Sequence, residues 1–478
     1  MPQCFVRSVR LVPPTICIPF EGCFKRARRP KKEEANSYKV ALSRHGGGRS
    51  SMLNRNLESN MTNPDSPSFA PAHLVKAMDE AMAAASESGA VMQTAGPSDY
   101  HGRYVDIGGQ QLLNFGCCSY LGLEIRPELK EGAIDATRRY GTQFPFPRAL
   151  LQSPLYQELD ASLRTITGGH VVVAASTSLA HISALPVLLE PGDAALIDVN
   201  AHASLHTASA LLRGIPLEPI RHNRMDILEK RIQTLSAKHR RIWYILDGLY
   251  SMVGDFAPID DLAVLLQKYP ALHLYVDDAH STSWTGTFGR GYALERLVDR
   301  ERVVGVLSLN KAFSAAGGAL VLPTEALANR IRRAGGPMVF SGAIQPPMLG
   351  AAVASARIHL SQEMPSLQSG LAARIQATIT RAAEQDVPLV DTTHSPVFFL
   401  KTKSTEKAFS LTTALRREGF CVCTSMFPIV PRNHAGIRFT ISLHNEIADI
   451  EHLMSALAAQ VELLGLKPSS HREIDECA

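Results

Sequence analysis

The sequence of 478 residues lacks several features that would mark a membrane protein, a zinc protein or a dithiol redox protein. No apolar run approaches the ~20 residues that cross a bilayer, because charges, prolines and glycines interrupt the longest runs. The eight cysteines include no Cys-x-x-Cys pair, which argues against zinc and thioredoxin-like chemistry. We therefore expect no membrane span and no metal. Cys421 and Cys423 are predicted to be buried free thiols, which fits a reducing, cytoplasmic location.

The chain also lacks the basic surface of a nucleic-acid-binding protein. Its net charge is +4, but residues 1–60 hold twelve Lys and Arg against four Glu, so the remainder carries about −4 by difference. The charged run 25–32 would remain solvated. Residues 1–65 are predicted to be a disordered or untranslated extension, with Met52 or Met61 as alternative starts. Organelle targeting by this basic segment stays open.

What the sequence does contain is a regular alternation of strands and helices. The strongest strands, 242–246, 272–276 and 303–307, are nearly continuous apolar runs, as is typical of parallel strands covered on both faces. Amphipathic helices are expected between the strands. Their ranges are 155–167, 178–189, 202–212 and 226–237. The pattern predicts an α/β fold with a large, doubly wound, mainly parallel sheet.

The pattern changes after Pro346-Pro347. Long helices are followed by short strands and further helices, which indicates a smaller C-terminal α+β domain. Expected helices cover 348–360, 367–385, 407–418 and 446–464, and expected strands cover 397–400, 422–425 and 437–442. We predict an N-terminal arm at 66–110 packing on the small domain, a large domain at 111–345, and a small domain at 346–478 with a disordered tail.

Polar residues follow four of the predicted strands at the point where each strand ends. Ligands of open parallel sheets bind at the carboxyl ends of strands, so these residues are predicted to form one site. The four segments are Ser176-Thr177-Ser178, Asp247 with Tyr250-Ser251, Asp277-Asp278-Ala279-His280, and Ser308-Leu309-Asn310-Lys311. Together they offer groups that a phosphorylated, positively charged ring could use.

In these segments and others, the sequence resembles the α-oxoamine synthases, which are fold-type-I pyridoxal-phosphate enzymes. That family includes 8-amino-7-oxononanoate synthase, glycine C-acetyltransferase, 5-aminolevulinate synthase and serine palmitoyltransferase. The resemblance covers roughly residues 110–465, in order and with few gaps. It is carried by Tyr120-Leu121-Gly122-Leu123, Pro191-Gly192-Asp193, His202-Ala203-Ser204, Tyr250-Ser251-Met252-Val253-Gly254-Asp255, Asp277-Asp278-Ala279-His280, Gly289-Arg290-Gly291, Lys311-Ala312-Phe313 and Arg438 with Ile441-Ser442-Leu443.

The resemblance implies pyridoxal 5'-phosphate as the cofactor and gives four residues catalytic roles. Lys311 would carry the cofactor as a Schiff base and later act as general base. Asp277 would pair with the pyridine nitrogen and keep it protonated. His280 would hydrogen-bond the ring hydroxyl, although a satisfied core histidine is the alternative. His202 would stack over the ring.

Further cofactor contacts follow from the same resemblance. The backbone amides of Thr177 and Ser178 stand where the family holds the phosphate at a helix start. Ser251 and Ser308 align with a cofactor-binding serine and a phosphate-binding threonine. Ser341 and Gly342 match a segment that the neighbouring subunit contributes, which implies a homodimer with shared active sites.

The substrate region departs most from the family pattern. Met426 stands where catalytic members often place an arginine, before Pro428-Ile429-Val430-Pro431. Arg438 is then the expected partner of the substrate carboxylate, with a structural salt bridge as the alternative. Cys117-Cys118-Ser119 replaces the usual Ser-Asn-Asp and also changes the pocket.

The expected reaction is a condensation of an amino acid with an acyl thioester, on coenzyme A or an acyl-carrier protein, with loss of carbon dioxide to give an α-aminoketone. An aminotransferase or a carbon–carbon lyase on the same fold is the alternative, because a cofactor site alone does not fix the reaction. A non-catalytic subunit of a synthase complex is a third reading, against which Lys311 argues.

Overall fold

The computed structural model describes residues 72–431 and 433–466. The predicted extension at 1–65 and the predicted C-terminal tail lie outside these residues. None of the helices within the described ranges combines the length and the hydropathy needed to cross a membrane. The same ranges hold no group of three or more His, Cys, Asp or Glu side chains that could bind a metal ion.

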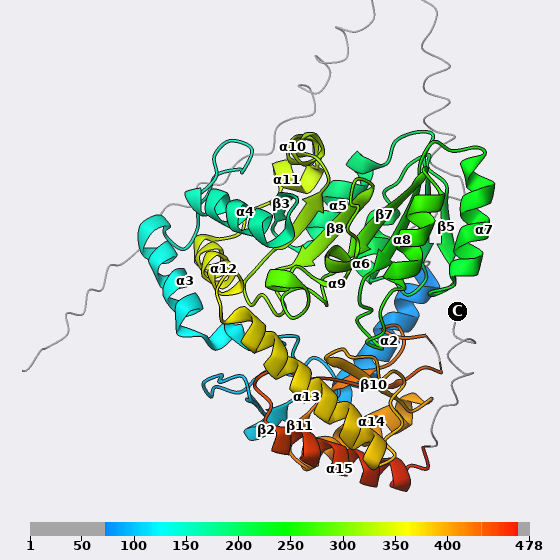
Figure 1. The fold of residues 1–478 in the computed structure, drawn as a ribbon. Helices are drawn as coiled ribbons and strands as arrows, with labels where there is room; N and C mark the ends of the chain where they lie inside the picture. The colour runs from blue at the N-terminus through cyan, green and yellow to red at the C-terminus, as the bar shows by residue number, and fades with distance from the viewer. Residues whose placement is uncertain (1–71, 432, 467–478) are drawn as a thin grey trace, which may run out of the picture. The chain divides into compact units, whose positions relative to one another are not determined.

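A seven-stranded sheet dominates the fold (Figure 1). Its order is β3-β9-β8-β7-β6-β4-β5. The pairs among β4 to β8 are parallel, whereas β9 runs antiparallel to both β3 and β8. The strands are β3 (His170–Ala174), β4 (Ala194–Asp198), β5 (Leu217–Ile220), β6 (Ile242–Asp247), β7 (Leu272–Asp277), β8 (Val303–Ser308) and β9 (Gly318–Leu322). The predicted α/β class with a mainly parallel sheet is confirmed.

Helices cover both faces of this sheet, because side chains in a strand alternate between the faces. Trp243 and Ile245 pack with α5, α6, α10 and α11, whereas Tyr244 and Leu246 pack with α7, α8 and α9. The helices are α3 (Pro127–Tyr140), α4 (Pro154–Thr167), α5 (Thr177–Leu188), α6 (Ala203–Ser209), α7 (Met225–Ser236), α8 (Ile259–Lys268), α9 (Tyr292–Arg296), α10 (Glu325–Ala334) and α11 (Gly336–Phe340), with 3-10 turns η2 (Leu123–Ile125) and η3 (Thr287–Gly289).

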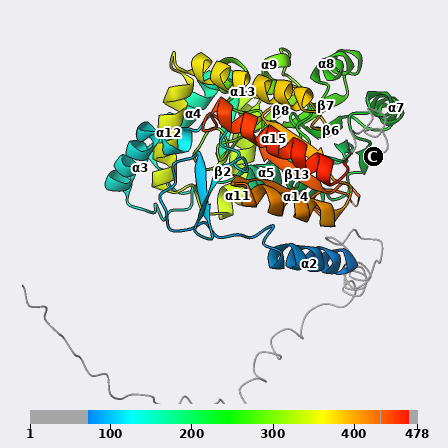
Figure 2. The same ribbon diagram turned by 90° about the horizontal axis from the view of Figure 1, so that it is seen from below.

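Two three-stranded sheets complete the fold: β1-β2-β11, which joins residues 104–114 to a C-terminal strand, and β10-β13-β12 of the C-terminal region. Helix α15 packs against α13, as the view in Figure 2 shows. The remaining elements are α2 (Ala72–Glu87), β1 (Tyr104–Ile107), β2 (Gln110–Asn114), α12 (Pro346–His359), α13 (Met364–Glu384), β10 (Val397–Lys401), α14 (Thr405–Arg417), β11 (Phe420–Cys421), β12 (Cys423–Ser425), β13 (Gly436–Thr440) and α15 (Ile447–Leu463). Cys421 and Cys423 are free thiols as predicted, although half-buried rather than buried.

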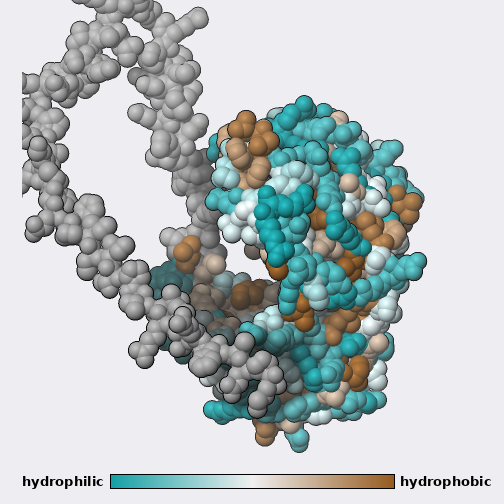
Figure 3. Space-filling model, turned by 90° about the vertical axis from the view of Figure 1, so that its left-hand side faces the viewer, coloured by the Kyte–Doolittle hydropathy of each residue, from teal (hydrophilic) through white to brown (hydrophobic). Residues whose placement is uncertain are grey.

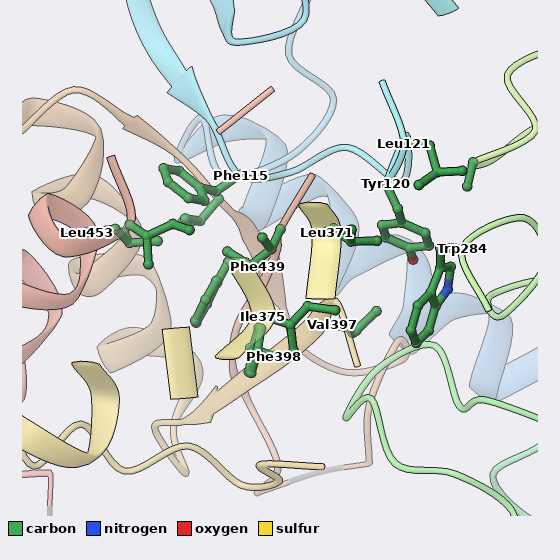
Figure 4. Packing of buried hydrophobic residues seen from close by; sticks show 14 of the residues in the cluster. Phe115, Tyr120, Leu121, Trp284, Leu371, Ile375, Val397, Phe398, Phe439 and Leu453 are labelled. Atoms are coloured by element: carbon green, nitrogen blue, oxygen red, sulfur yellow. The ribbon is translucent and has the colours of Figure 1, made fainter. Parts of the chain in front are cut away.

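One hydrophobic cluster joins the small sheets to segments that follow β6 and β7. Phe398 and Phe439 stack at its centre with ring centroids 5.3 Å apart. In Figure 4, Tyr120 and Trp284 lie next to each other on the side of the cluster opposite Phe115 and Leu453. On the face drawn in Figure 3, by contrast, hydrophilic side chains alternate with small patches of hydrophobic ones. The cluster therefore fixes the C-terminal strands beside the strand ends that carry the predicted site.

Candidate functional site

A cavity of about 300 Å³ lies at the carboxyl ends of the parallel strands. Side chains that follow β3, β4, β6, β7 and β8 converge on it, which is the place where open α/β sheets bind ligands. Its lining residues are Thr177, Ser178, His202, Ser204, Asp247, Leu249, Asp277, Ala279, His280 and Lys311. The cavity thus brings together the four residues predicted to be catalytic and the two predicted at the phosphate end.

Helix α5 begins at this cavity. Ser176 caps it, and the Ser176 hydroxyl accepts a hydrogen bond from the Leu179 N–H at 3.2 Å. The first N–H groups of a helix have no acceptor within the helix and attract anions. Gly318 of β9 lies against this turn, since a Cβ there would stand 2.7 Å from the Thr177 backbone. The glycine therefore permits the close approach of β9 that forms the phosphate end of the cavity.

Asp277 ends β7 and is 5% exposed. Its Oδ1 accepts a hydrogen bond from the Ala279 N–H at 3.0 Å, and its Oδ2 lies 2.9 Å from Nε2 of His181. Burial alone would raise the pKa of Asp277, but His181, Lys311 and His202 together hold it below its usual value. The carboxylate is therefore charged and can pair with a cationic ring nitrogen.

Asp247 ends the neighbouring strand β6 at the position paired with Asp277. Its Oδ1 accepts the backbone N–H of His202 at 3.1 Å. Burial, with the nearby Asp277 charge, raises the pKa of Asp247 well above its usual value. The two adjacent carboxyl groups therefore differ, because their surroundings favour the ionised state at Asp277 and the protonated state at Asp247.

Lys311 lies in the loop between β8 and β9, which backbone and side-chain hydrogen bonds hold in place. The Leu309 N–H donates to the Gly317 carbonyl at 2.9 Å, and the Gly317 N–H donates to Oδ1 of Asn310 at 2.6 Å. Burial lowers the pKa of Lys311, although Asp277 opposes this effect. A desolvated amine of this kind is a better nucleophile and base at neutral pH than a surface lysine.

Two histidines line the cavity in different environments. His280 is 7% exposed, and its Nδ1 lies 2.8 Å from the Tyr120 hydroxyl. Burial, with the charges of Lys311 and Arg438, holds the pKa of His280 well below its usual value, so the ring is neutral. His202 caps α6, where its Nδ1 accepts from the Ser204 N–H at 3.3 Å. Partial burial lowers the pKa of His202 as well.

Four predicted cofactor contacts lie outside the cavity lining. Ser308 is buried at the end of β8, where its hydroxyl accepts from the Asn310 N–H at 3.2 Å. Ser251 lies on the adjoining cleft. Ser341 and Gly342 line a separate cavity of about 260 Å³ beside Arg148. Within the described part of one chain, these four residues do not meet Lys311 in one pocket, and their roles stay predictions.

The structure explains why Met426 replaces an arginine. Met426 is 1% exposed and packs in a small apolar cluster with Ala85 of α2, Ala408 of α14 and Ala435. An arginine there would place a charge in apolar surroundings, which is costly. Position 426 therefore serves to pack the N-terminal helix.

Arg438 of β13 is 7% exposed and reaches toward the site. Its Nε donates to the Ser251 carbonyl at 2.6 Å, and its Nη2 lies 3.8 Å from Sγ of Cys118. The carboxylate of an amino acid could accept from the remaining guanidinium N–H groups. Arg438 thus remains the predicted substrate-binding residue.

A larger cleft, with an open volume of about 2250 Å³, adjoins the cavity. Ala201 and Ala203 of the cleft flank His202 of the cavity in the chain. Basic and apolar side chains both line the cleft. They include Arg221, His222, Arg224, Lys401, Met252, Val253, Phe256, Phe399 and Ile429. An elongated ligand with apolar and anionic parts could therefore reach the cavity from this side.

Sequence reasoning missed His181, Tyr120, Ser204 and Leu249. His181 gave a usable signal, because it follows Thr177 by four residues in a helix and therefore faces the same side. Tyr120 lies 160 residues from its partner His280, so the spacing gave no indication of their contact. Asp247 was predicted to lie in the site, because it follows a strand, but it was given no role.

Three comparisons place these observations among known proteins. Residues 150–457 match the family described as aminotransferase class I and II. An 8-amino-7-oxononanoate synthase of Maricaulis maris is 33% identical over 362 residues, covering 74% of this chain and 88% of the relative. A serine palmitoyltransferase of Bacteriovorax stolpii is 26% identical over 369 residues, covering 77% of this chain and 86% of the relative. The solved Sphingomonas wittichii serine palmitoyltransferase shares the fold, with TM-score 0.76 and 20% identity over 84% of this chain and 100% of its own.

Proposed function

This chain belongs to the aminotransferase class I and II family, and from that premise we propose that it is a pyridoxal-phosphate-dependent acyltransferase of the α-oxoamine synthase type. It condenses an amino acid with an acyl thioester and releases carbon dioxide and the thiol, leaving an α-aminoketone. The observation that carries the proposal is the single cavity in which the Lys311 amine, the Asp277 carboxylate and the start of α5 meet.

The residues present fit pyridoxal phosphate. The first N–H groups of α5, at Thr177 and Ser178, suit a phosphate. The ionised Asp277 suits a protonated pyridine nitrogen, and the buried Lys311 amine suits covalent attachment to an aldehyde. The neutral rings of His202 and His280 suit stacking and hydrogen bonding. When bound, the cofactor supplies an electron sink for the α-carbon of the amino acid.

The chain's own residues supply orientation and proton transfer. Arg438 binds the substrate carboxylate, because its buried guanidinium acts on His280 of the cavity and keeps N–H groups for a carboxylate. Lys311 removes the α-proton through Nζ, which its lowered pKa makes a competent base. His202 lines the cavity, and its chain neighbours Ala201 and Ala203 line the cleft, so it polarises the incoming thioester carbonyl. The raised pKa of Asp247 disfavours a second negative charge beside Asp277.

The cleft beside His202 is the proposed binding place of the acyl thioester. Met252, Val253 and Phe256 offer apolar contacts for an acyl chain, and Arg221 and Lys401 lie on the same cleft and suit the phosphate of a thioester carrier. Both coenzyme A and an acyl-carrier protein present such a phosphate, so the geometry supports the chemistry of either carrier.

The proposal also includes assembly as a homodimer and a location in the cytoplasm. Leu150, Leu151 and Phe340 expose 76%, 47% and 89% of their surface, which exceeds what isolated apolar side chains usually present together. Phe340 directly precedes Ser341 and Gly342, the segment expected to serve the neighbouring active site. The free thiols at Cys117 and Cys118 support a reducing compartment.

The test uses the full chain, a panel of amino acids and a panel of acyl thioesters. The expected result is an α-aminoketone with equimolar carbon dioxide and free thiol, detected by mass spectrometry and a thiol assay. Lys311→Ala should fold, lose the visible absorbance of the bound cofactor and form no product, whereas the surface variant Lys268→Ala should behave as the parent. Amino-group transfer to a keto acid without release of thiol would instead identify an aminotransferase and refute the proposal.

A further inference from the structure

A buried histidine that was not among the predicted site residues contacts Asp277, the carboxylate proposed to pair with the cofactor ring. His181 of α5 is fully buried, and its Nε2 lies 2.9 Å from Oδ2 of Asp277. Its Nδ1 lies 3.0 Å from the Tyr275 hydroxyl, and the two rings meet edge to face at 5.7 Å. Tyr275 and Asp277 are two positions apart on β7, so both point to the same face of the sheet. His181 bridges them.

The tyrosine determines the tautomer of this histidine. Tyr275 is fully buried, and burial raises its pKa well above the usual value, so its hydroxyl keeps the proton. The hydroxyl is thus available to donate to Nδ1 of His181, and this donation places the ring proton on Nε2. The Nε2–H then donates to Asp277 Oδ2. The Ala279 N–H occupies Oδ1, so both oxygens of Asp277 are held from the protein side.

The same contact distinguishes Asp277 from its neighbour Asp247. The two carboxyl groups occupy paired positions on β6 and β7 and are both buried. Two negative charges so close together repel, so one of the pair favours the protonated state. Among the described residues, Asp247 accepts a backbone N–H from His202, whereas Asp277 contacts both an imidazole and a backbone N–H. The imidazole favours charge on Asp277.

We propose that His181, held in one tautomer by Tyr275, is a positioning residue that orients Asp277 and keeps the negative charge of the Asp247–Asp277 pair on Asp277. This inference rests on the proposed function, because the charge on Asp277 matters only for a bound cationic ring. The other titratable groups that act on Asp277 are Lys311 of the β8–β9 loop, His202 at the start of α6, and the neighbouring carboxyl groups of Asp247 and Asp278. All four remain in the variants below.

The experiment compares full-length His181→Leu, His181→Gln and Tyr275→Phe with the parent. Glutamine can place an N–H donor near the position of Nε2, whereas leucine has none. The dissociation constant of pyridoxal 5'-phosphate is measured by titrating the apo-protein between acid and alkaline pH, with circular dichroism as the folding control. The pH dependence of the absorbance of the bound cofactor is the second readout.

For His181→Leu the dissociation constant should rise about 10- to 100-fold, the loss typical when a hydrogen-bonded partner of a ligating group is removed. Its acid-side midpoint should move to higher pH, because Asp277 without its donor takes up a proton more readily. His181→Gln should recover most of the affinity, and Tyr275→Phe should shift both readouts in the same direction by less. If His181→Leu does not fold, the Gln and Phe variants decide.

Parent-like affinity and an unchanged midpoint in His181→Leu would overturn the inference, as would a parent-like Tyr275→Phe when the leucine variant does not fold. Failure of the parent itself to bind pyridoxal phosphate would instead overturn the proposed function. The two failures are therefore distinguishable from the same titrations.

Discussion

A large pH-dependent contribution to stability is expected from His222, which lies on the wall of the large cleft. Its Nδ1 is 3.0 Å from Oδ1 of Asp198 and its Nε2 is 2.7 Å from Oδ2 of Asp255. Burial alone would lower the pKa of His222, but the bonds to both carboxylates raise it to about 10. The imidazolium therefore persists in the folded state at a pH where an unfolded histidine is neutral.

The size of this stabilisation follows from the shift of the His222 pKa. A pKa raised from 6.5 to about 10 corresponds to roughly 4–5 kcal/mol of stability, since each pKa unit is worth about 1.4 kcal/mol. The folded chain holds one more proton than the unfolded chain between these two values, so the free energy of unfolding falls as pH rises. The contribution is complete below pH 6.5 and is lost by about pH 10. Replacement by glutamine removes it.

Urea denaturation followed by circular dichroism measures the effect. From about pH 7 to about pH 9 the free energy of unfolding of the parent should fall by about 2–3 kcal/mol more than that of His222→Gln. His273→Gln is the matched control, because His273 is also half-buried but bonds the Ala271 carbonyl, not an acid, and burial lowers its pKa. Equal pH dependence in the parent and His222→Gln would refute the reasoning.

Two further substitutions test the substrate region. Met426→Ala should lower the free energy of unfolding by about 2–5 kcal/mol in denaturant titrations, because it opens a cavity in the cluster that holds α2, whereas Met426→Leu should cost less than about 1.5 kcal/mol. A parent-like alanine variant would show that this cluster does not hold α2. Arg438→Gln should raise KM for the amino acid about tenfold or more and leave KM for the acyl thioester within about twofold, because a charge-assisted hydrogen bond is worth about 1.5–3 kcal/mol. Steady-state kinetics with each substrate varied in turn would contradict this if both values stayed unchanged.

The fold was largely predictable because its strands are apolar over their whole length. Runs such as 242–246 and 272–276 have few alternatives to a buried strand, and the structure extends each by one residue to the functional aspartate. Strand β9 was missed, because a run of five residues after Lys311 is too short to identify as a strand by itself. Its antiparallel direction becomes visible only in the sheet. Helix α3 was missed because only Leu129 and Ala136 of it are buried, which leaves little hydrophobic period.

The site was predictable where chemistry follows the end of a strand. Thr177, His202, Asp277 and Lys311 all come within a few residues of a strand end, and the sheet brings those ends together. Contacts that depend on packing across elements gave no such signal. His181 faces Asp277 only because α5 packs over β7. The boundaries at 66, 111 and 346 and the contacts of Ser341 and Gly342 stay predictions.

The strand order of the large sheet has a consequence for folding during synthesis. Strand β3, the first of this sheet to be synthesised, lies at its edge and pairs with β9, the last. The start of α5, which suits the phosphate, follows β3, and Lys311 precedes β9. The two meet only when β9 pairs with β3, so they stay apart while residues 318–322 of a nascent chain are still inside the ribosome. Binding of pyridoxal phosphate is therefore expected only after strand β9 has left the ribosome.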